Sequence, residues 1–203
     1  MDGTRSDPNF AISPNTYLFC QKTYLHFATT KKRVKFMDAF ELFAPKYYKE
    51  SDLPKELYSP ITDGLWMGGT ADDDWIESGK DLAEFEENNQ FQSVVTLFSW
   101  AHPMPWGVEE LRWGFPDSHI DLVDKSRLFR VVDWAYERWQ SGDKVLIRCQ
   151  AGLNRSGLVT ALLLLKADYS MVEAIELIRK NRSPIALFNE HFVSYLVSLE
   201  PSH

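Results

Sequence analysis

Cys149 and Arg155 lie six residues apart in the stretch CQAGLNRSG, between the apolar runs VLIR and LVTALLLL. The first run predicts a buried strand and the second predicts a buried helix. The small residues Ala151 and Gly152 let successive backbone N–H groups turn inward, which makes a nest for an anion. A helix that begins near Ser156 would point its first N–H groups and its dipole at the same place.

The chemistry expected of this loop is attack on phosphorus. The positive field of the nest and the helix favours the thiolate form of Cys149, and a thiolate is a strong nucleophile. Arg155 can fold back and offer a planar fork to two phosphate oxygens. A Walker loop is excluded, because no Gly-Lys-Ser/Thr follows the glycine. The alternative is a structural cysteine beside a surface arginine, which the strand–loop–helix setting disfavours.

A phosphate monoester also needs a proton for its leaving oxygen, and the donor must come from another loop. Asp117 in WGFPDSH follows a predicted strand and lies 149 − 117 = 32 residues before Cys149. The alternative for Asp117 is a turn former beside a proline. Asp121 and Asp124 are rivals, although Asp124 stands where a helix N-cap is wanted.

The composition indicates a soluble globular chain of 203 residues with a net charge of −7, which argues against nucleic acid and anionic lipid as partners. The opening residues MDGTRSDPNFAISPN have no apolar core, so no secretory signal is expected. The run GLVTALLLLKA has about half of the roughly 20 residues that a bilayer span needs. Cys20 and Cys149 are then expected to stay reduced, and we expect a cytoplasmic enzyme.

No metal or other cofactor is expected. Asp72, Asp73 and Asp74 could bind a metal, but such a run is more often the acidic first turn of a helix. No Cys or His cluster has the spacing of a zinc site.

The order of elements predicts an α/β domain with a central, mostly parallel sheet flanked by helices. Strands or hairpins are expected at ITDGLWMGGT, FQSVVTLFSW, Leu111–Phe115 and DKVLIRC. Helices are expected after Thr70, in DKSRLFRVVDWAYERWQSG with Leu128, Val131, Val132 and Ala135 inward, in LVTALLLLKA, after the capping box of Ser170 and Glu173, and in NEHFVSYLVSLE. Residues 1–55 are expected to be an N-terminal extension that packs its aromatic side chains on the main domain, residues 56–203.

From about Tyr58 to Leu199, the chain resembles the cysteine-dependent protein tyrosine phosphatases, in particular the dual-specificity branch and its bacterial and phage members. The resemblance is carried by CQAGLNRS, by the upstream Asp117, by ITDGLWMGG and by IRKNRSPIALFNEHFVSYL. It implies a phosphotyrosine-phosphatase-like fold and a metal-independent phosphatase of phosphorylated proteins.

The resemblance also implies a role for each site residue. Cys149 would form a phosphocysteine, Asp117 would protonate the leaving group and then activate water, and Ser156 would hydrogen-bond the thiolate. The phosphoryl oxygens would be held by Arg155 and by the N–H groups of Gln150, Ala151, Gly152, Leu153, Asn154 and Arg155.

The chain departs from the family at Arg148, where members usually have histidine. The loop lacks the two lysines typical of inositol-lipid phosphatases. Asn154 beside Arg155 is also seen in the related RNA 5′-triphosphatases, so that activity stays open as an alternative. An inactive phosphate-binding module is a further alternative, which the presence of Cys149, Arg155 and Asp117 disfavours.

Overall fold

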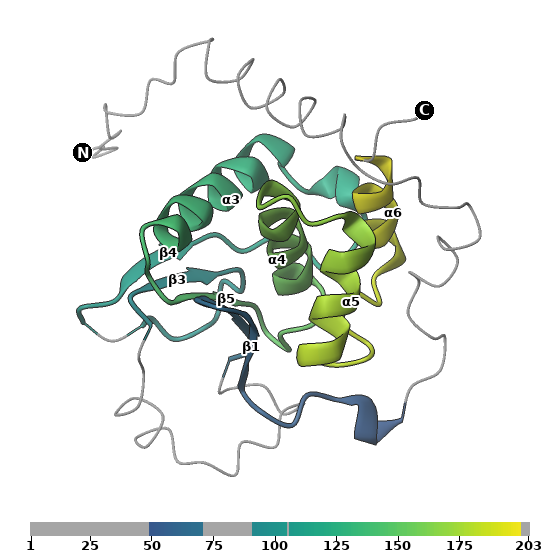
Figure 1. The fold of residues 1–203 in the computed structure, drawn as a ribbon, viewed down its shortest axis with the longest axis horizontal. Coiled ribbons are helices and arrows are strands. Elements are labelled where there is room, and N and C mark those ends of the chain that lie inside the picture. The colour runs from purple at the N-terminus through teal and green to yellow at the C-terminus, as the bar shows by residue number, and fades with distance from the viewer. Residues whose placement is uncertain (1–48, 71–90, 105, 200–203) are drawn as a thin grey trace, which may run out of the picture. The chain divides into compact units, whose positions relative to one another are not determined.

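The structure is a computed structural model that describes residues 49–70, 91–104 and 106–199. In this part of the chain, the strands form one sheet in the order β1-β2-β5-β3-β4 (Figure 1). They are β1 (Tyr58–Thr62), β2 (Leu65–Gly68), β3 (Ser93–Thr96), β4 (Glu109–Arg112) and β5 (Val145–Arg148). β1 and β2 are antiparallel, and the pairs β2–β5, β5–β3 and β3–β4 are parallel. The predicted α/β class and the mostly parallel sheet are confirmed.

The first two strands form the hairpin expected from ITDGLWMGGT. Thr62 pairs with Leu65, so the turn contains Asp63 and Gly64. Gly64 has φ +70°, a left-handed conformation that glycine adopts without steric cost. Its carbonyl oxygen accepts a hydrogen bond from the Val145 N–H at 2.8 Å, which ties the hairpin to the start of β5.

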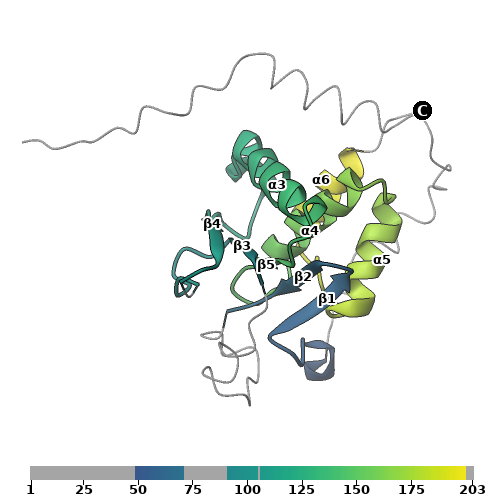
Figure 2. The same ribbon diagram turned by 60° about the vertical axis from the view of Figure 1, so that its left-hand side comes forward.

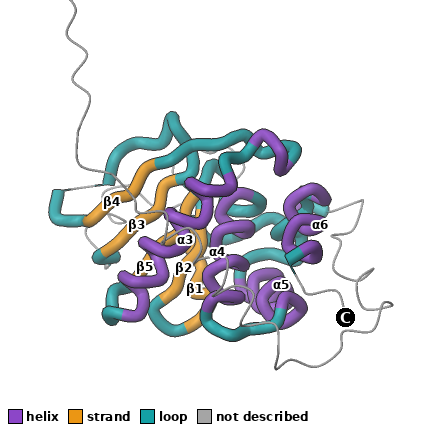
Figure 3. Tube along the Cα trace, turned by 90° about the horizontal axis from the view of Figure 1, so that it is seen from above, coloured by secondary structure: helices purple, strands orange, loops and turns teal. Residues whose placement is uncertain are grey.

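Four helices cover one face of the sheet in the described part of the chain (Figure 2). They are α3 (Lys125–Gln140), α4 (Arg155–Lys166), α5 (Met171–Asn181) and α6 (Glu190–Ser198). Helix α4 packs on β5 and β2, with α3 over β3 and β5, α5 against β1, and α6 on α4. Figure 3 shows this helical layer over the strands. Residues 49–70, 91–104 and 106–199 also contain two short 3₁₀ turns, η3 (Glu50–Asp52) and η4 (Ile120–Leu122).

The helices form where their caps and apolar faces predict. Asp124 caps α3 by accepting a hydrogen bond from the Arg127 N–H at 3.0 Å. Ser170 and Glu173 form the expected capping box of α5. The predicted inward face of α3 is buried, and every residue of α4 from Ser156 to Leu164 is buried. An apolar surface all round α4 is therefore explained by its central place between α3, α5, α6 and the sheet.

One predicted strand is displaced. β4 spans Glu109–Arg112 instead of the expected Leu111–Phe115. The Trp113 N–H still donates to the Thr96 carbonyl at 2.9 Å, and the chain then leaves the sheet through Gly114 and Pro116. Proline has no N–H to continue a ladder. The early end of β4 frees residues 113–119, the segment that carries Asp117.

Some predictions fall outside the described residues. They are the helix expected after Thr70, the acidic run Asp72–Asp74, and residues 1–48 of the expected extension. The remainder of that extension touches the described domain at Asp52, whose carbonyl oxygen accepts a hydrogen bond from Ser183 Oγ.

Candidate active site

The loop Cys149–Asn154 joins the carboxyl end of β5 to the first residue of α4. Cys149 is 2% exposed, and its Sγ lies 3.3 Å from the Oγ of Ser156. The Cys149 N–H donates to the Gly68 carbonyl at 3.2 Å, and the Gln150 carbonyl accepts from the Thr70 N–H at 2.9 Å. The loop is thus held along one side by the residues that end and follow β2.

Gly152 is the residue that lets the loop pack so closely. Its φ is +68°, and a Cβ built there would lie 2.3 Å from the carbonyl carbon of Gly68 and 2.6 Å from Nη2 of Arg182. A side chain at this position would therefore collide with backbone and with a buried guanidinium. The expectation that small residues shape the turn agrees with this geometry.

Arg182, which follows α5, supports the loop from outside. It is 5% exposed, its Nε donates to the Gly152 carbonyl at 3.0 Å, and its Nη2 donates to the Ala151 carbonyl at 3.3 Å. Its Nη1 donates to Ser59 Oγ at 3.2 Å and to the carbonyl of Glu56. Because two loop carbonyls face Arg182, they are directed away from an anion bound by the loop N–H groups.

The charge of Arg182 bears on the cysteine. Burial lowers the pKa of Arg182 to about 10, and the nearby charge of Cys149 acts in the opposite direction. Arg182 therefore stays a cation at neutral pH and places a buried positive charge near the thiol. Sequence reasoning missed this residue, since RKNRSP contains nothing that separates a buried arginine from an exposed one.

Arg155 begins α4, and its side chain reaches the carboxyl end of β3. Its Nη1 donates to the Leu97 carbonyl at 3.1 Å, and its guanidinium lies 5.4 Å from the ring centroid of Phe98. Its Nε is buried and has no hydrogen-bond partner among the described residues. A buried donor of this kind usually has a function, because leaving it unpaired costs free energy.

Asp117 reaches the same loop from the segment that follows β4. Its Oδ2 accepts a hydrogen bond from Nδ2 of Asn154 at 3.0 Å, and its Oδ1 accepts one from Nδ2 of Asn189 at 2.8 Å. The rival Asp121 instead lies 3.3 Å from Nζ of Lys125, and the rival Asp124 caps α3 as expected. Of these three carboxylates, Asp117 is the one that contacts the cysteine loop.

Arg148, the departure from the family pattern, does not extend toward the cysteine loop. Its Nε donates to Thr96 Oγ1 at 2.9 Å, and its Nη2 lies 2.6 Å from the His102 carbonyl oxygen and 3.2 Å from Oε1 of Glu110. Neighbouring side chains of a strand point to opposite faces, so Arg148 and Cys149 diverge. Arg148 binds the loop that follows β3, which also carries the contacts of Arg155.

Glu110 is the acidic centre of that network. Burial by itself would raise the pKa of Glu110, but hydrogen bonds from Thr96 Oγ1 and the Met104 N–H and the charges of Arg112 and Arg148 outweigh it. The pKa of Glu110 therefore lies below the usual value for glutamate. The ionised carboxylate accepts the Met104 N–H and so holds the end of the 98–104 loop against the sheet.

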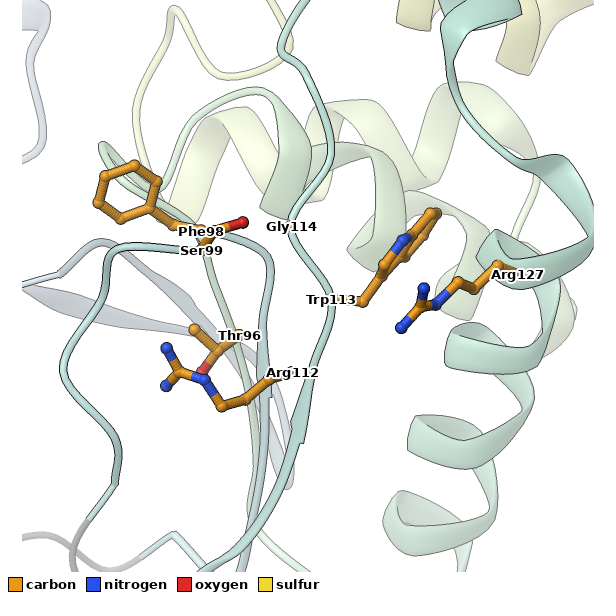
Figure 4. Close-up of a pocket in the computed structure, with 7 residues that line it drawn as sticks. All are labelled: Thr96, Phe98, Ser99, Arg112, Trp113, Gly114 and Arg127. Atoms are coloured by element: carbon orange, nitrogen blue, oxygen red, sulfur yellow. The ribbon is translucent and has the colours of Figure 1, made fainter. Parts of the chain in front are cut away.

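A hollow of about 340 Å³ opens beside this network, between the segments that follow β3 and β4 (Figure 4). Arg127 lies on one wall, with its guanidinium 5.5 Å from the ring of Trp113. Phe98 lies on the opposite wall and is shared with the contacts of Arg155. The other lining residues are Thr96, Ser99, Arg112 and Gly114.

Within residues 49–70, 91–104 and 106–199, no group of three or more His, Cys, Asp and Glu side chains could hold a metal ion. None of the helices in these ranges is long and apolar enough to cross a membrane.

The chain is similar to known phosphatases in sequence. Residues 116–202 match the family model of the dual specificity phosphatase catalytic domain. A relative in Invertebrate iridescent virus 6, named "Putative tyrosine phosphatase 123R", is 30% identical over 96 residues, which cover 44% of this chain and 67% of the relative.

The chain is also similar to solved structures. Tk-PTP in its active form is 27% identical with a TM-score of 0.57, and the match covers 71% of this chain and 96% of that one. Human DUSP28 shares the fold, at 19% identity and a TM-score of 0.59, over 73% of this chain and 96% of that one.

The fold and the Cys-x5-Arg loop between β5 and α4 define the class of cysteine-dependent protein tyrosine phosphatases. Within this class, the chain belongs to the dual-specificity phosphatase family, as the family model and the viral relative show. It is therefore an enzyme that removes phosphate from phosphorylated substrates.

Proposed function

We propose that the enzyme hydrolyses phosphate monoesters of proteins without a metal, through a phosphocysteine intermediate on Cys149. The observation that carries the proposal is the meeting of three groups at one loop. A buried sulfur lies next to the Ser156 hydroxyl, an unpartnered donor of Arg155 lies at the same helix end, and a carboxylate contacts Asn154 of the loop.

The first step transfers the phosphoryl group to sulfur. The Cys149 thiolate attacks phosphorus, an S–P bond forms, and the P–O bond to the leaving oxygen breaks. Asp117 gives its proton to that oxygen, so the product leaves as a phenol or an alcohol. Arg155 and the N–H groups of residues Gln150 to Arg155 bind the phosphoryl oxygens, whose charge they stabilise most in the transition state.

The second step releases phosphate. A water molecule attacks phosphorus, Asp117 takes a proton from that water, and the S–P bond breaks. Ser156 Oγ, 3.3 Å from Sγ, donates a hydrogen bond to the departing thiolate. The enzyme returns to its first state with Asp117 protonated and Cys149 ionised.

The decisive test is Cys149→Ser. It should abolish hydrolysis of an aryl phosphate measured in EDTA, while vanadate still binds, because the loop and Arg155 remain. Acid quenching of the wild-type enzyme during turnover of a ³²P-labelled substrate should trap label on the protein, and Cys149→Ser should trap none. Metal-dependent activity, or turnover by Cys149→Ser, would overturn the proposal.

The RNA 5′-triphosphatase alternative rested on Asn154. The side chain of this residue is 3% exposed and contacts Asp117 and Asn189, which accounts for it without an RNA substrate. Release of phosphate from triphosphorylated RNA, measured beside release from phosphotyrosine peptides, separates the two activities. An inactive binding module would give neither.

We further propose that residues 56–203 form the catalytic domain, that residues 1–55 are an extension packed on it, and that the enzyme acts in the cytoplasm. A reducing compartment keeps a catalytic thiol available. Limited proteolysis of the full chain tests the extension, because a packed segment resists cleavage and an unpacked one is removed first.

A further inference from the structure

Asn154 occupies the N-cap position of α4 and does not cap it. Asparagine is among the preferred N-cap residues because its side-chain oxygen accepts an N–H from the first turn, and such caps contribute about 1 kcal/mol. Here the residue has φ −94° and ψ −63°, and its side chain makes no capping hydrogen bond. The first N–H groups of α4 stay free for an anion, and the amide is directed elsewhere.

The hydrogen bonds fix which way this buried amide points. The Asn189 N–H donates to Oδ1 of Asn154 at 3.1 Å. A backbone N–H can only donate, so the atom that faces it must be the oxygen. The Nδ2 group is therefore on the other side, where it donates to Oδ2 of Asp117 at 3.0 Å.

Asn189 completes the arrangement from the start of α6. Its own Oδ1 caps α6 by accepting from the His191 N–H at 3.0 Å. Its Nδ2 donates to Oδ1 of Asp117 at 2.8 Å and to the Ser118 carbonyl at 3.1 Å. The side-chain amides of Asn154 and Asn189 thus join the cysteine loop, the start of α6 and the segment that follows β4.

We propose that Asn154 is a positioning residue for proton transfer by Asp117, acting together with Asn189. The proposal rests on the proposed function, in which Asp117 is the general acid and base. One amide donates to each carboxyl oxygen, so the plane of the carboxyl group is fixed relative to Cys149. Each carboxyl oxygen has a second lone pair, which can carry the proton that passes to the leaving oxygen or, in the ionised form, accept a hydrogen bond from water.

Asn154 also couples acid placement to the loop itself. Its backbone belongs to the loop that is proposed to bind phosphate, and its side chain holds the acid. A displacement of about 1 Å in such a group can cost on the order of 10²-fold in rate. Asn154, the last residue of the loop before α4, therefore also positions the carboxyl group of Asp117. It does so without contacting the leaving group.

The test is Asn154→Ala in the full chain, with two substrates that differ in their leaving groups. For a phosphotyrosine peptide we expect kcat/KM to fall by about 10- to 100-fold. For an activated nitrophenyl phosphate, whose leaving group needs little protonation, we expect a loss several times smaller. The inhibition constant of vanadate should stay close to the wild-type value, which shows that the loop is intact.

A double-mutant cycle shows whether Asn154 acts through Asp117. In the Asp117→Ala background, Asn154→Ala should cause almost no further loss with the peptide. Asn189→Ser should reproduce the leaving-group dependence while α6 stays capped, because serine is also a good N-cap. Asn181→Ala is the matched control: it removes an asparagine that donates to the Ile61 carbonyl, away from the loop, and should leave both substrates unaffected.

The outcomes separate the inference from the proposed function. Equal losses with both substrates together with weaker vanadate binding would overturn the inference, because Asn154 would then only maintain the loop. Full additivity with Asp117→Ala would overturn it as well. If Asp117→Ala itself showed no dependence on the leaving group, the proposed role of Asp117 would fail first, and the positioning role with it.

Discussion

Arg155 donates from Nη1 to the carbonyl oxygen of Leu97 at 3.1 Å, so the first residue of α4 is tied to the end of β3. This bond uses one arm of the guanidinium and leaves Nε buried without a partner among the described residues. The planar group is held in place before any substrate arrives. A fork that is already oriented loses little entropy when it binds an oxyanion.

The Arg155→Lys substitution should therefore lose most of the activity although it keeps the charge. A lysine ammonium has no Nε and no planar fork, so it cannot keep the Leu97 bond and also offer two parallel donors. We expect kcat to fall by about 10²–10³, the loss typical of a removed transition-state donor. Arg130→Lys, on an exposed position of α3, is the control. A kcat near that of the control would show that the fork is not used.

Asp117→Ala should affect substrates according to their leaving groups. A tyrosine phenolate or a serine alkoxide needs a proton, so kcat should fall by about 10²–10⁴ with phosphopeptides and much less with an activated aryl phosphate. Asp121→Ala, which removes a carboxylate paired with Lys125, should leave kcat near the wild-type value with both kinds of substrate. The reverse pattern would assign the acid to Asp121.

Arg182→Met should weaken both the fold and anion binding. Methionine fills a similar space but leaves the carbonyls of Ala151 and Gly152 without their buried donor, at about 1–3 kcal/mol for each unpaired group. Urea unfolding should show the lost stability, and the inhibition constant of phosphate should rise. Arg130→Met measures what the loss of an exposed arginine costs. Unchanged phosphate inhibition would mean that the loop keeps its shape without support from outside.

The network of Arg148 and Glu110 should appear in the acid stability of the enzyme. The folded-state pKa of Glu110 is lowered, so its carboxylate contributes stability that is complete above the unfolded value of about 4.3. This contribution is lost as the pH falls through the folded pKa. The advantage of wild type over Glu110→Gln in unfolding free energy should be constant near neutral pH and should shrink below about pH 4.3. Glu137→Gln, on the exposed face of α3, should show no such trend.

Much of this site could be predicted from local sequence. The strand, the small residues and the helix around Cys149 and Arg155 are neighbours in the chain, and their geometry follows from short-range rules. β4 begins two residues and ends three residues earlier than predicted, which shows the limit of such rules, because the end of a strand depends on its partner. The place of Asp117 beside the loop is likewise set by a strand pairing, that of β4 with β3.

The residues that sequence reasoning missed act over long separations. Arg182 lies 30 residues from the Gly152 carbonyl that it binds, and Asn189 lies 72 residues from Asp117. An asparagine or an arginine in a loop has many possible partners, and only the packing of α5 and α6 selects one. The direction of the Arg148 side chain was easier to predict, because successive side chains of a strand alternate and Arg148 therefore points away from Cys149.

The nucleophile and the acid follow strands that differ in how firmly they are held in the sheet. Cys149 follows β5, which is paired on both sides, whereas Asp117 follows β4, which forms one edge of the described sheet. An edge strand is expected to open at a lower free energy than a central strand, so the attachment of the acid should open before the phosphate-binding loop does. Mutations can also accumulate in this edge segment without unfolding the phosphate-binding loop. Loss of the segment that carries Asp117 would leave a protein that still binds phosphorylated partners but hydrolyses them far more slowly.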